Sequence, residues 1–259
     1  MRIIVCVKQV PSTNEVRLDP VTKTILRDGR QAVINPFDLY AIEEAVRLRE
    51  KHGGSVCALS MGIPATERLL RDAMARGVDR AVLLTDRAFA GADTLATSYA
   101  LSLGVKQIGD FDLIICGKMA VDGDTAQIGP ELSAQLGIPF LTEVRRITES
   151  SETMLRCERR TDFGYAEAEI RLPAVITVSS DVNLPRFATI AGVRASLEAP
   201  FRSFTAEEVG ADAGRCGLNG SPTQVVRSFT PDRTHRAEYL NGTTAENADA
   251  VKKLWKEVR

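Results

Sequence analysis

A regular alternation of short apolar runs with amphipathic stretches constrains the fold of this chain most strongly. The runs are nearly free of charged side chains, as in parallel strands that are covered on both faces. The expected strands lie at residues 3–7, 55–60, 81–85, 113–116 and 173–178. Stretches with apolar side chains at helical spacing follow the first four strands and begin at Asn35-Pro36, Pro64, Asp93-Thr94 and Glu131. A small antiparallel pair is also expected at residues 16–18 and 24–26, around the turn Asp19-Pro20. The pattern as a whole predicts an α/β fold with a doubly wound, mostly parallel sheet.

The alternation breaks down in the second half of the chain, where three strand-like segments are joined by short polar turns. These segments are residues 142–148, 154–160 and 165–171. They predict an antiparallel meander at the edge of the sheet. After Ala199 the chain is rich in Gly, Ser, Thr, Asn and Arg, up to a helix-like end at residues 245–258 that carries the single tryptophan. We therefore expect a domain at residues 1–199 and an extended C-terminal arm at residues 200–259, which is either disordered or laid on another protein.

Composition argues against several classes of protein. The 33 basic and 34 acidic residues nearly balance, which gives no sign of a nucleic-acid groove or a membrane surface. No apolar run approaches the roughly 18 residues that span a bilayer, and the apolar start is too short for a signal peptide. The five cysteines lack the close spacing of a zinc or iron–sulfur site, and such an odd, scattered set suits the cytoplasm. The chain has two histidines, which argues against catalysis built on histidine. We expect no catalytic acid or base and no metal site.

Residues 117–130 form the most informative candidate site. They follow the expected strand at residues 113–116, precede an expected helix at residues 131–136, and are rich in Gly, Asp and Thr. A strand, a turn of this composition and a helix N-terminus together make an anion site of phosphate size. The segment is neither a G-x-x-x-x-G-K-[ST] phosphate loop nor a G-x-G-x-x-G dinucleotide fingerprint, and the turn after the first strand, residues 8–12, has no glycine.

The residue types within this segment leave two interpretations open. Asp122, Gly123 and Asp124 are common in ordinary turns, so a turn without a ligand is one interpretation. The other is a phosphate site, because the side chains at residues 125–127 and Gly129 are small or neutral and leave backbone N–H groups accessible to an anion. The carboxylates of such a site are expected to bind sugar hydroxyls or neighbouring amides rather than phosphate.

Two shorter motifs are further candidates. In the first, Asn35 either only caps a helix that starts at Pro36, or it hydrogen-bonds an adenine or ribose while Phe37 packs nearby. In the second, Met61 ends the second strand and precedes a glycine that either starts a loop or allows close approach of a ligand.

The loop that starts at Asn183 follows the last buried strand. It is either a plain loop with a helix capped at Thr189, or an exposed recognition loop with an apolar tip.

Together these residues resemble the β subunit of electron transfer flavoproteins over most of the chain. The resembling segments are residues 7–11, 35–38, 43–48, 117–129, 172–178, 183 and 185–189. The resemblance implies a Rossmann-like domain with a buried nucleotide and a C-terminal extension that wraps a larger α subunit, whose mobile domain carries a flavin. It also implies that the loop after the last strand docks on an acyl-CoA dehydrogenase or another flavin dehydrogenase, with Ile190 as apolar anchor and Arg186 beside it.

The resemblance carries two sets of binding residues over to this chain. The nucleotide set is Cys6, Asn35, Pro36, Phe37, Asp38, Met61, Gly117, Lys118, Val121, Asp122, Gly123, Asp124, Thr125, Ala126, Gln127, Ile128 and Gly129. The partner set is Asn183, Pro185, Arg186, Phe187 and Ile190.

The family divides by the nucleotide that the β subunit holds. Simple carriers place AMP there, whereas electron-bifurcating members place a second FAD that accepts hydride from NADH. Bifurcation sends electrons to ferredoxin or flavodoxin and, through the α-subunit FAD, to a partner dehydrogenase. Residues 122–130 are similar to the bifurcating version, since small side chains leave room for the ribityl and phosphate groups of FAD. We therefore expect FAD, and an AMP-binding structural subunit of a one-flavin carrier stays open as the alternative.

One residue departs from the family pattern, and one alternative function lies outside the family. Arg160 stands where many members carry a Glu that helps to hold the flavin domain, so that contact is expected to differ here. An ATP-cleaving adenylating enzyme is a third alternative, but it needs a pyrophosphate loop after the first strand, which residues 8–14 lack.

Overall fold

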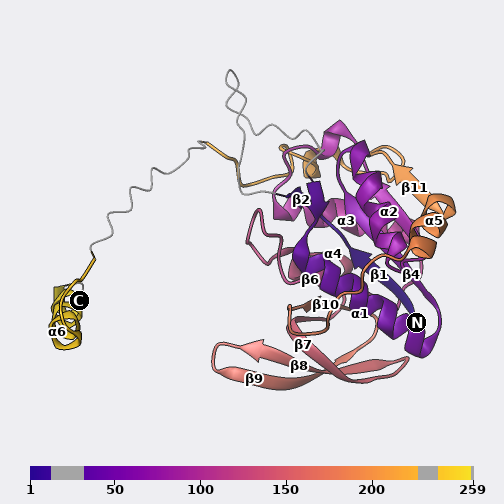
Figure 1. Ribbon diagram of the computed structural model, residues 1–259. Coiled ribbons are helices and arrows are strands. Elements are labelled where there is room, and N and C mark those ends of the chain that lie inside the picture. The colour runs from indigo at the N-terminus through magenta and orange to yellow at the C-terminus, as the bar shows by residue number, and fades with distance from the viewer. Residues whose placement is uncertain (13–31, 227–238, 258–259) are drawn as a thin grey trace. The chain divides into compact units, whose positions relative to one another are not determined.

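A computed structural model describes residues 1–12, 32–226 and 239–257 and divides the chain into two compact units, Met1–Gln224 and Val225–Arg259 (Figure 1). The small antiparallel pair expected around Asp19-Pro20 lies outside the described residues.

The first unit is built on a nine-stranded sheet in the order β11-β5-β4-β1-β6-β10-β7-β8-β9 (Figure 1). Its strands are β1 (Arg2–Cys6), β4 (Ser55–Met61), β5 (Arg80–Leu84), β6 (Leu113–Gly117), β7 (Phe140–Ser150), β8 (Met154–Thr161), β9 (Gly164–Arg171), β10 (Ala174–Val178) and β11 (Phe201–Phe204). Pairing is parallel from β11 through to β7 and antiparallel along β7, β8 and β9. The α/β class, the mostly parallel sheet and the antiparallel meander at one edge are therefore confirmed. A separate antiparallel pair, β2 (Gln9–Pro11) and β3 (Ala32–Ile34), follows β1.

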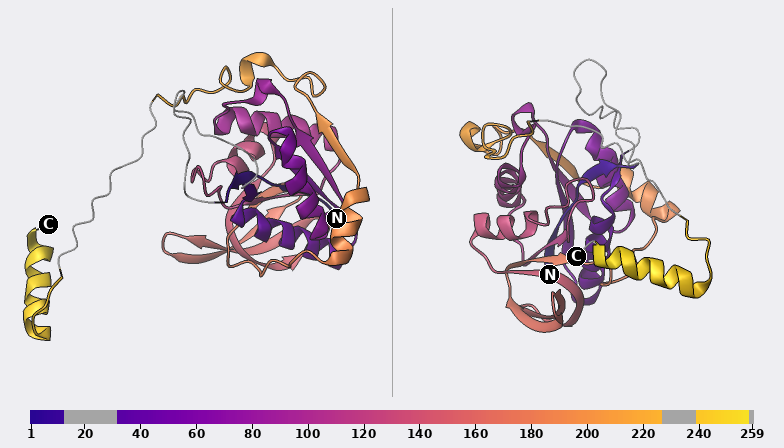
Figure 2. Two further views of the ribbon diagram at one scale, coloured as in Figure 1. Left: turned by 45° about the horizontal axis from the view of Figure 1, so that its top comes forward. Right: turned by 90° about the vertical axis from the view of Figure 1, so that its left-hand side faces the viewer.

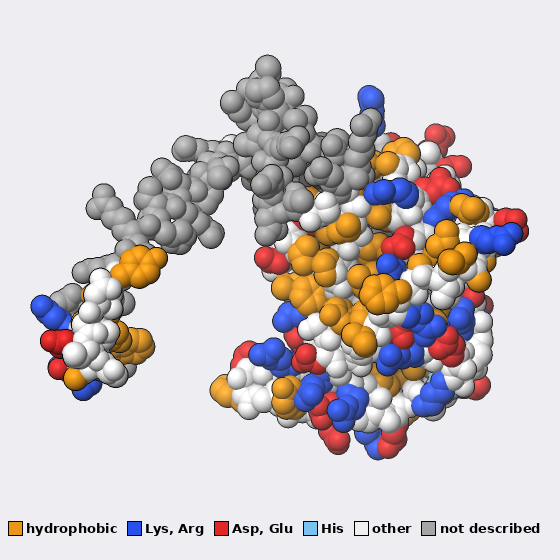
Figure 3. All heavy atoms as spheres, in the orientation of Figure 1, with side chains coloured by type: hydrophobic (Ala, Val, Ile, Leu, Met, Phe, Trp, Pro, Cys, Tyr) orange, Lys and Arg blue, Asp and Glu red, His pale blue; other side chains and the backbone are white. Residues whose placement is uncertain are grey.

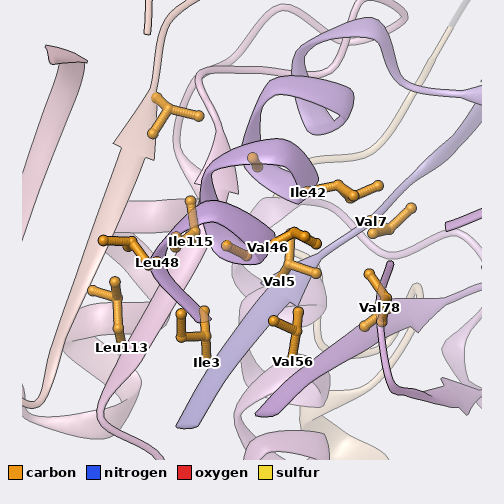
Figure 4. Packing of buried hydrophobic residues seen from close by; sticks show 14 of the residues in the cluster. Ile3, Val5, Val7, Ile42, Val46, Leu48, Val56, Val78, Leu113 and Ile115 are labelled. Carbon is orange, nitrogen blue, oxygen red and sulfur yellow. The ribbon is translucent and has the colours of Figure 1, made fainter. Parts of the chain in front are cut away.

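Helices cover both faces of this sheet (Figure 2). They are α1 (Pro36–His52), α2 (Glu67–Ala75), α3 (Thr94–Ile108), α4 (Ile128–Leu136) and α5 (Ile190–Glu198). Successive side chains of a strand point to opposite faces, so Ile3 and Val5 of β1 join the core beneath α1 and α2 (Figure 4), whereas Ile4 and Cys6 join the core beneath α3 and α4. This two-sided burial explains why the parallel strands read as continuous apolar runs.

Residues 200–224 belong to the first unit, although their composition resembles that of the expected C-terminal arm. β11 adds to the sheet beside β5, and Val209 and Cys216 are buried in the core beneath α3. The N–H of Asp212 also donates to the hydroxyl of Tyr99 on α3 at 3.0 Å. The boundary expected at residue 199 therefore falls inside the first unit, which runs to Gln224.

The second unit contains α6 (Thr244–Glu257), which agrees with the expected C-terminal helix. Its apolar side chains Val251, Leu254 and Trp255 are all more than half exposed. None of the helices within the described ranges combines the length and apolar character needed to cross a bilayer.

Candidate functional site

The candidate nucleotide site lies where the chain reverses its direction of travel across the sheet. β1 and β6 are neighbours, but after β1 the chain moves to β4, whereas after β6 it moves to the side of β10 and β7. In open α/β sheets, the crevice at the carboxyl ends of two such strands is the usual place for a ligand. Lys8 follows β1 at this crevice, and residues 118–127 follow β6 there.

The buried side chain of Asn35 fixes the first half of the loop after β6. Its Nδ2 donates to Asp38 Oδ1 at 2.8 Å and to the carbonyl of Met119 at 2.9 Å, and its Oδ1 accepts from the N–H of Val121 at 3.1 Å. Although Asn35 stands at the N-cap position of α1, its side chain makes no capping hydrogen bond. We assign the Asn35 side chain a positioning role, because its amide is taken up by protein partners.

Asp38 is the second buried polar group at this junction. Its Oδ2 accepts from the N–H of Lys8 at 2.7 Å, while its Oδ1 accepts from Asn35. A Cβ atom at Gly117 would collide with the same carboxylate, which accounts for a glycine at the end of β6. Burial raises the pKa of Asp38 to about 7, although its hydrogen bonds from Lys8, Asn35 and Gly117 favour the ionised form.

The second half of the loop is open to solvent and shaped for an anion. Asp124 and Ala126 have left-handed φ angles of 52° and 55°, and residues 121–127 are all exposed. Within the described part of the chain, the N–H groups of residues 125–127 donate to no other residue. α4 begins directly afterwards at Ile128, with no side-chain cap. A concavity of phosphate size forms where free N–H groups precede a helix N-terminus and left-handed residues alternate with residues of other conformation.

Close packing sets where α4 starts. A Cβ atom at Gly129 would collide with Cγ2 of Thr177 on β10, so the first turn of α4 lies directly on that strand. At Gly123, in contrast, an added Cβ would meet no atom within 4 Å.

Two lysines lie at the loop, and each is paired with a carboxylate. Lys118 Nζ is 2.8 Å from Glu143, whose φ of 59° and hydrogen bond to the Thr177 hydroxyl hold it at a bulge of β7. Lys8 Nζ is 2.6 Å from Asp122 in the loop itself. Lys8 was not among the site residues expected from the sequence. Its position directly after the first strand, at the edge of the sheet where ligands bind, could have indicated it.

The structure brings most of the expected nucleotide residues together. Asn35 to Asp38, Cys6 and the loop of residues 117–129 all lie at the carboxyl ends of β1 and β6. Cys6 is buried beside Cys116, and all five cysteines are buried and free. Met61 ends β4, on the far side of β1 from the loop.

The expected partner residues divide into inward-facing and outward-facing groups. Asn183 Nδ2 donates to the carbonyl of Tyr40 and to Glu44, and Arg186 binds both Glu43 and Glu50 on α1, each at 2.7 Å. These hydrogen bonds from Arg186 lower the pKa of Glu50.

Apolar side chains of the same loop point outward instead. Phe187 and Ile190 are 87% and 85% exposed, and Val193 and Leu197 continue this apolar face along α5 (Figure 3). Pro185 is half-buried between the two groups. The loop is thus held from beneath by polar contacts and exposes an apolar tip.

A doubly wound sheet with an anion-binding loop at its switch point is typical of nucleotide-binding subunits. The model of the electron transfer flavoprotein domain matches residues 22–209. The chain is 45% identical to an electron transfer flavoprotein subunit beta from Thermoanaerobacterium thermosaccharolyticum, over 95% of this chain and 94% of that protein. It is 41% identical to the caffeyl-CoA reductase-Etf complex subunit CarD from Acetobacterium woodii, over 94% and 93%, and 43% identical to the protein FixA from Azorhizobium caulinodans, over 97% and 92%. The chain therefore belongs to the β subunits of the electron transfer flavoprotein family, as its sequence indicated, and an electron-transfer role follows.

Replacement of Gly129 by alanine tests the packing at the start of α4. The added Cβ forces α4 away from Thr177, so we expect a loss of about 1–3 kcal/mol in the free energy of unfolding, beyond the gain of up to about 1 kcal/mol in helix propensity. Gly123→Ala is the matched control and should lie within about 0.5 kcal/mol of the wild type, measured by chemical denaturation. Equal stability of the two variants would contradict the close packing of Gly129 against Thr177.

The raised pKa of Asp38 predicts a particular pH dependence of stability. An unfolded aspartate ionises near pH 4 and the folded one near pH 7, so the folded state holds one more proton between these values. The stabilising contribution of Asp38 to the free energy of unfolding is therefore present below about pH 4 and is lost as the pH rises to about 7. Relative to Asp38→Asn, the wild type should lose stability over this window in denaturant titrations and stay level above pH 8; a wild type that gains stability would refute the assignment.

Proposed function

We propose that this β subunit holds FAD at the crevice between β1 and β6 and works as the bifurcating half of an electron transfer flavoprotein. When bound, FAD would accept hydride from NADH and pass electrons to ferredoxin or flavodoxin and, through the α-subunit FAD, to a partner dehydrogenase. The redox chemistry belongs to the flavin, so the task of the chain is to place the cofactor and tune its surroundings.

The open loop of residues 121–127 carries this proposal. Its N–H groups, which have no acceptor in the part of the chain that the structure describes, and the start of α4, which has no side-chain cap, fit a phosphate group. Gly117 and Gly129 leave no room for larger side chains beneath the loop. The exposed residues of the loop are small apart from Val121 and Gln127, and this supports the larger nucleotide, FAD, over AMP.

The surrounding residues have supporting tasks in this proposal. Asn35 positions the backbone that faces the nucleotide, and the paired Lys118 and Glu143 add little net charge. A carboxylate repels phosphate, so Asp124, which is exposed, is assigned to hydrogen bonds from ribose hydroxyls, and Asp122 joins it when its ion pair with Lys8 opens. The adenylating alternative has no support from the family to which the chain belongs.

The partners follow from the family and from one relative in particular. CarD is a subunit of a complex of caffeyl-CoA reductase with an Etf, which supports a partner that acts on a CoA thioester here as well. We further propose that the second unit, with its exposed apolar helix α6, wraps the α subunit.

The apolar tip of the loop after β10 is the proposed contact for the dehydrogenase. Phe187 and Ile190 would supply buried apolar area, while Asn183, Pro185 and Arg186 hold the loop in shape. Such preorganisation lowers the entropy cost of docking.

The cytoplasm is the proposed location. NADH is available there, and five buried free cysteines suit a reducing compartment.

The cofactor count of the purified heterodimer tests the nucleotide proposal. We expect two FAD and no AMP per heterodimer, released by denaturation and separated by chromatography, and bleaching of the flavin absorbance by NADH without air. One FAD with one AMP, and no bleaching, would contradict the proposal and establish the AMP-binding alternative.

Phe187→Ala tests the docking surface. Removal of an exposed aromatic anchor should weaken electron transfer to the dehydrogenase by about 10- to 30-fold, as about 1.4–2 kcal/mol of contact is lost, without change in flavin content. Phe163→Ala is the matched control, because Phe163 is fully exposed in the β8–β9 turn at the opposite edge of the sheet from α5 and β11. Equal effects of the two changes would refute the assignment of the surface.

A further inference from the structure

We propose that the ammonium group of Lys8 binds the phosphate of the nucleotide, and that Asp122 holds this group in place until the nucleotide arrives. The inference rests on the proposed function, since it assumes that AMP or FAD occupies the crevice. It adds a phosphate-recognition residue to a site otherwise built from backbone N–H groups.

The backbone of Lys8 is fixed at the crevice. Its N–H donates to Asp38 Oδ2 at 2.7 Å, and its carbonyl accepts from the N–H of Asn35 at 2.9 Å. Both partners belong to the buried cluster that also holds the loop after β6. The side chain of Lys8 therefore starts from a rigid point beside the anion-binding loop and reaches that loop at Asp122.

The two lysines of the site differ in how firmly they are held. The Lys8 and Asp122 side chains are 50% and 30% exposed, whereas those of Lys118 and Glu143 are 28% and 25% exposed. Glu143 is also held at the bulge of β7. An exposed ion pair is weak because water screens it. Lys8 is thus the lysine that exchanges partners more easily.

The charges around the loop favour such an exchange. Asp122 and Asp124 both lie in the exposed loop, so a phosphate that approaches the N–H groups of residues 125–127 meets two carboxylates. An ammonium gains more from a phosphate, which carries up to two negative charges, than from one carboxylate. Transfer of Lys8 from Asp122 to the phosphate offsets this repulsion and leaves Asp122 free to turn toward the ribose.

The test measures nucleotide affinity of the heterodimer after its β-subunit nucleotide has been removed by dialysis against concentrated bromide. The probes are AMP, FAD and adenosine, which lacks the phosphate. The variants are Lys8→Gln, Lys8→Arg, Asp122→Asn and, as a matched control, Lys106→Gln, because Lys106 is an exposed lysine in the last turn of α3. Circular dichroism confirms that each variant is folded.

We expect Lys8→Gln to weaken binding of AMP and FAD by about 10- to 100-fold and to leave adenosine within about twofold. Lys8→Arg should restore most of the affinity, Asp122→Asn should tighten AMP binding, and Lys106→Gln should have no effect. The affinity of Lys8→Gln for AMP should also fall less with rising salt.

Two results would overturn the inference in distinguishable ways. If the wild type binds AMP or FAD and Lys8→Gln binds it equally well, Lys8 is not the phosphate ligand, while the nucleotide site stands. If the wild type binds neither nucleotide, the proposed function fails, and the role of Lys8 fails with it.

Discussion

The buried amide of Asn35 is the interaction on which the rest of the site depends. It joins three separate parts of the chain: the start of α1, the loop after β6 and, through Asp38, the turn after β1. A buried polar group left without partners costs about 1–3 kcal/mol, so these hydrogen bonds favour one arrangement of the three segments. These protein hydrogen bonds consequently fix the shape of the crevice between β1 and β6.

The loop after β6 combines a fixed half with an open half. Asn35 and Lys8 hold residues 119–122, whereas the N–H groups of residues 125–127 have no acceptor among the described residues and lie in a backbone with two left-handed residues. Non-glycine residues in this conformation cost about 1–2 kcal/mol each, and such strain gathers at binding sites. The loop after β10 follows the same plan, since Arg186 and Asn183 bind α1 while Phe187 and Ile190 face outward.

Much of the fold could be predicted from the sequence because its signals are local. The buried parallel strands read as apolar runs, and residues 117–129 combine the end of a strand, turn residues and a helix start within one short stretch. The features that could not be predicted depend on distant pairs. Asn35 meets Met119 across 84 positions and Lys8 meets Asp122 across 114, so neither contact leaves a pattern in the local sequence. β11 was missed because its short segment, Phe-Arg-Ser-Phe, joins the sheet only as an edge strand and is partly exposed.

The account rests on the claim that a nucleotide binds between the carboxyl ends of β1 and β6. A structure of the heterodimer purified with its own cofactors tests this most directly. The account predicts density for FAD in that crevice, with phosphate oxygens within hydrogen-bonding distance of the N–H groups of residues 125–129. A nucleotide bound elsewhere on this subunit, or one whose phosphates make no contact with this loop, would contradict it.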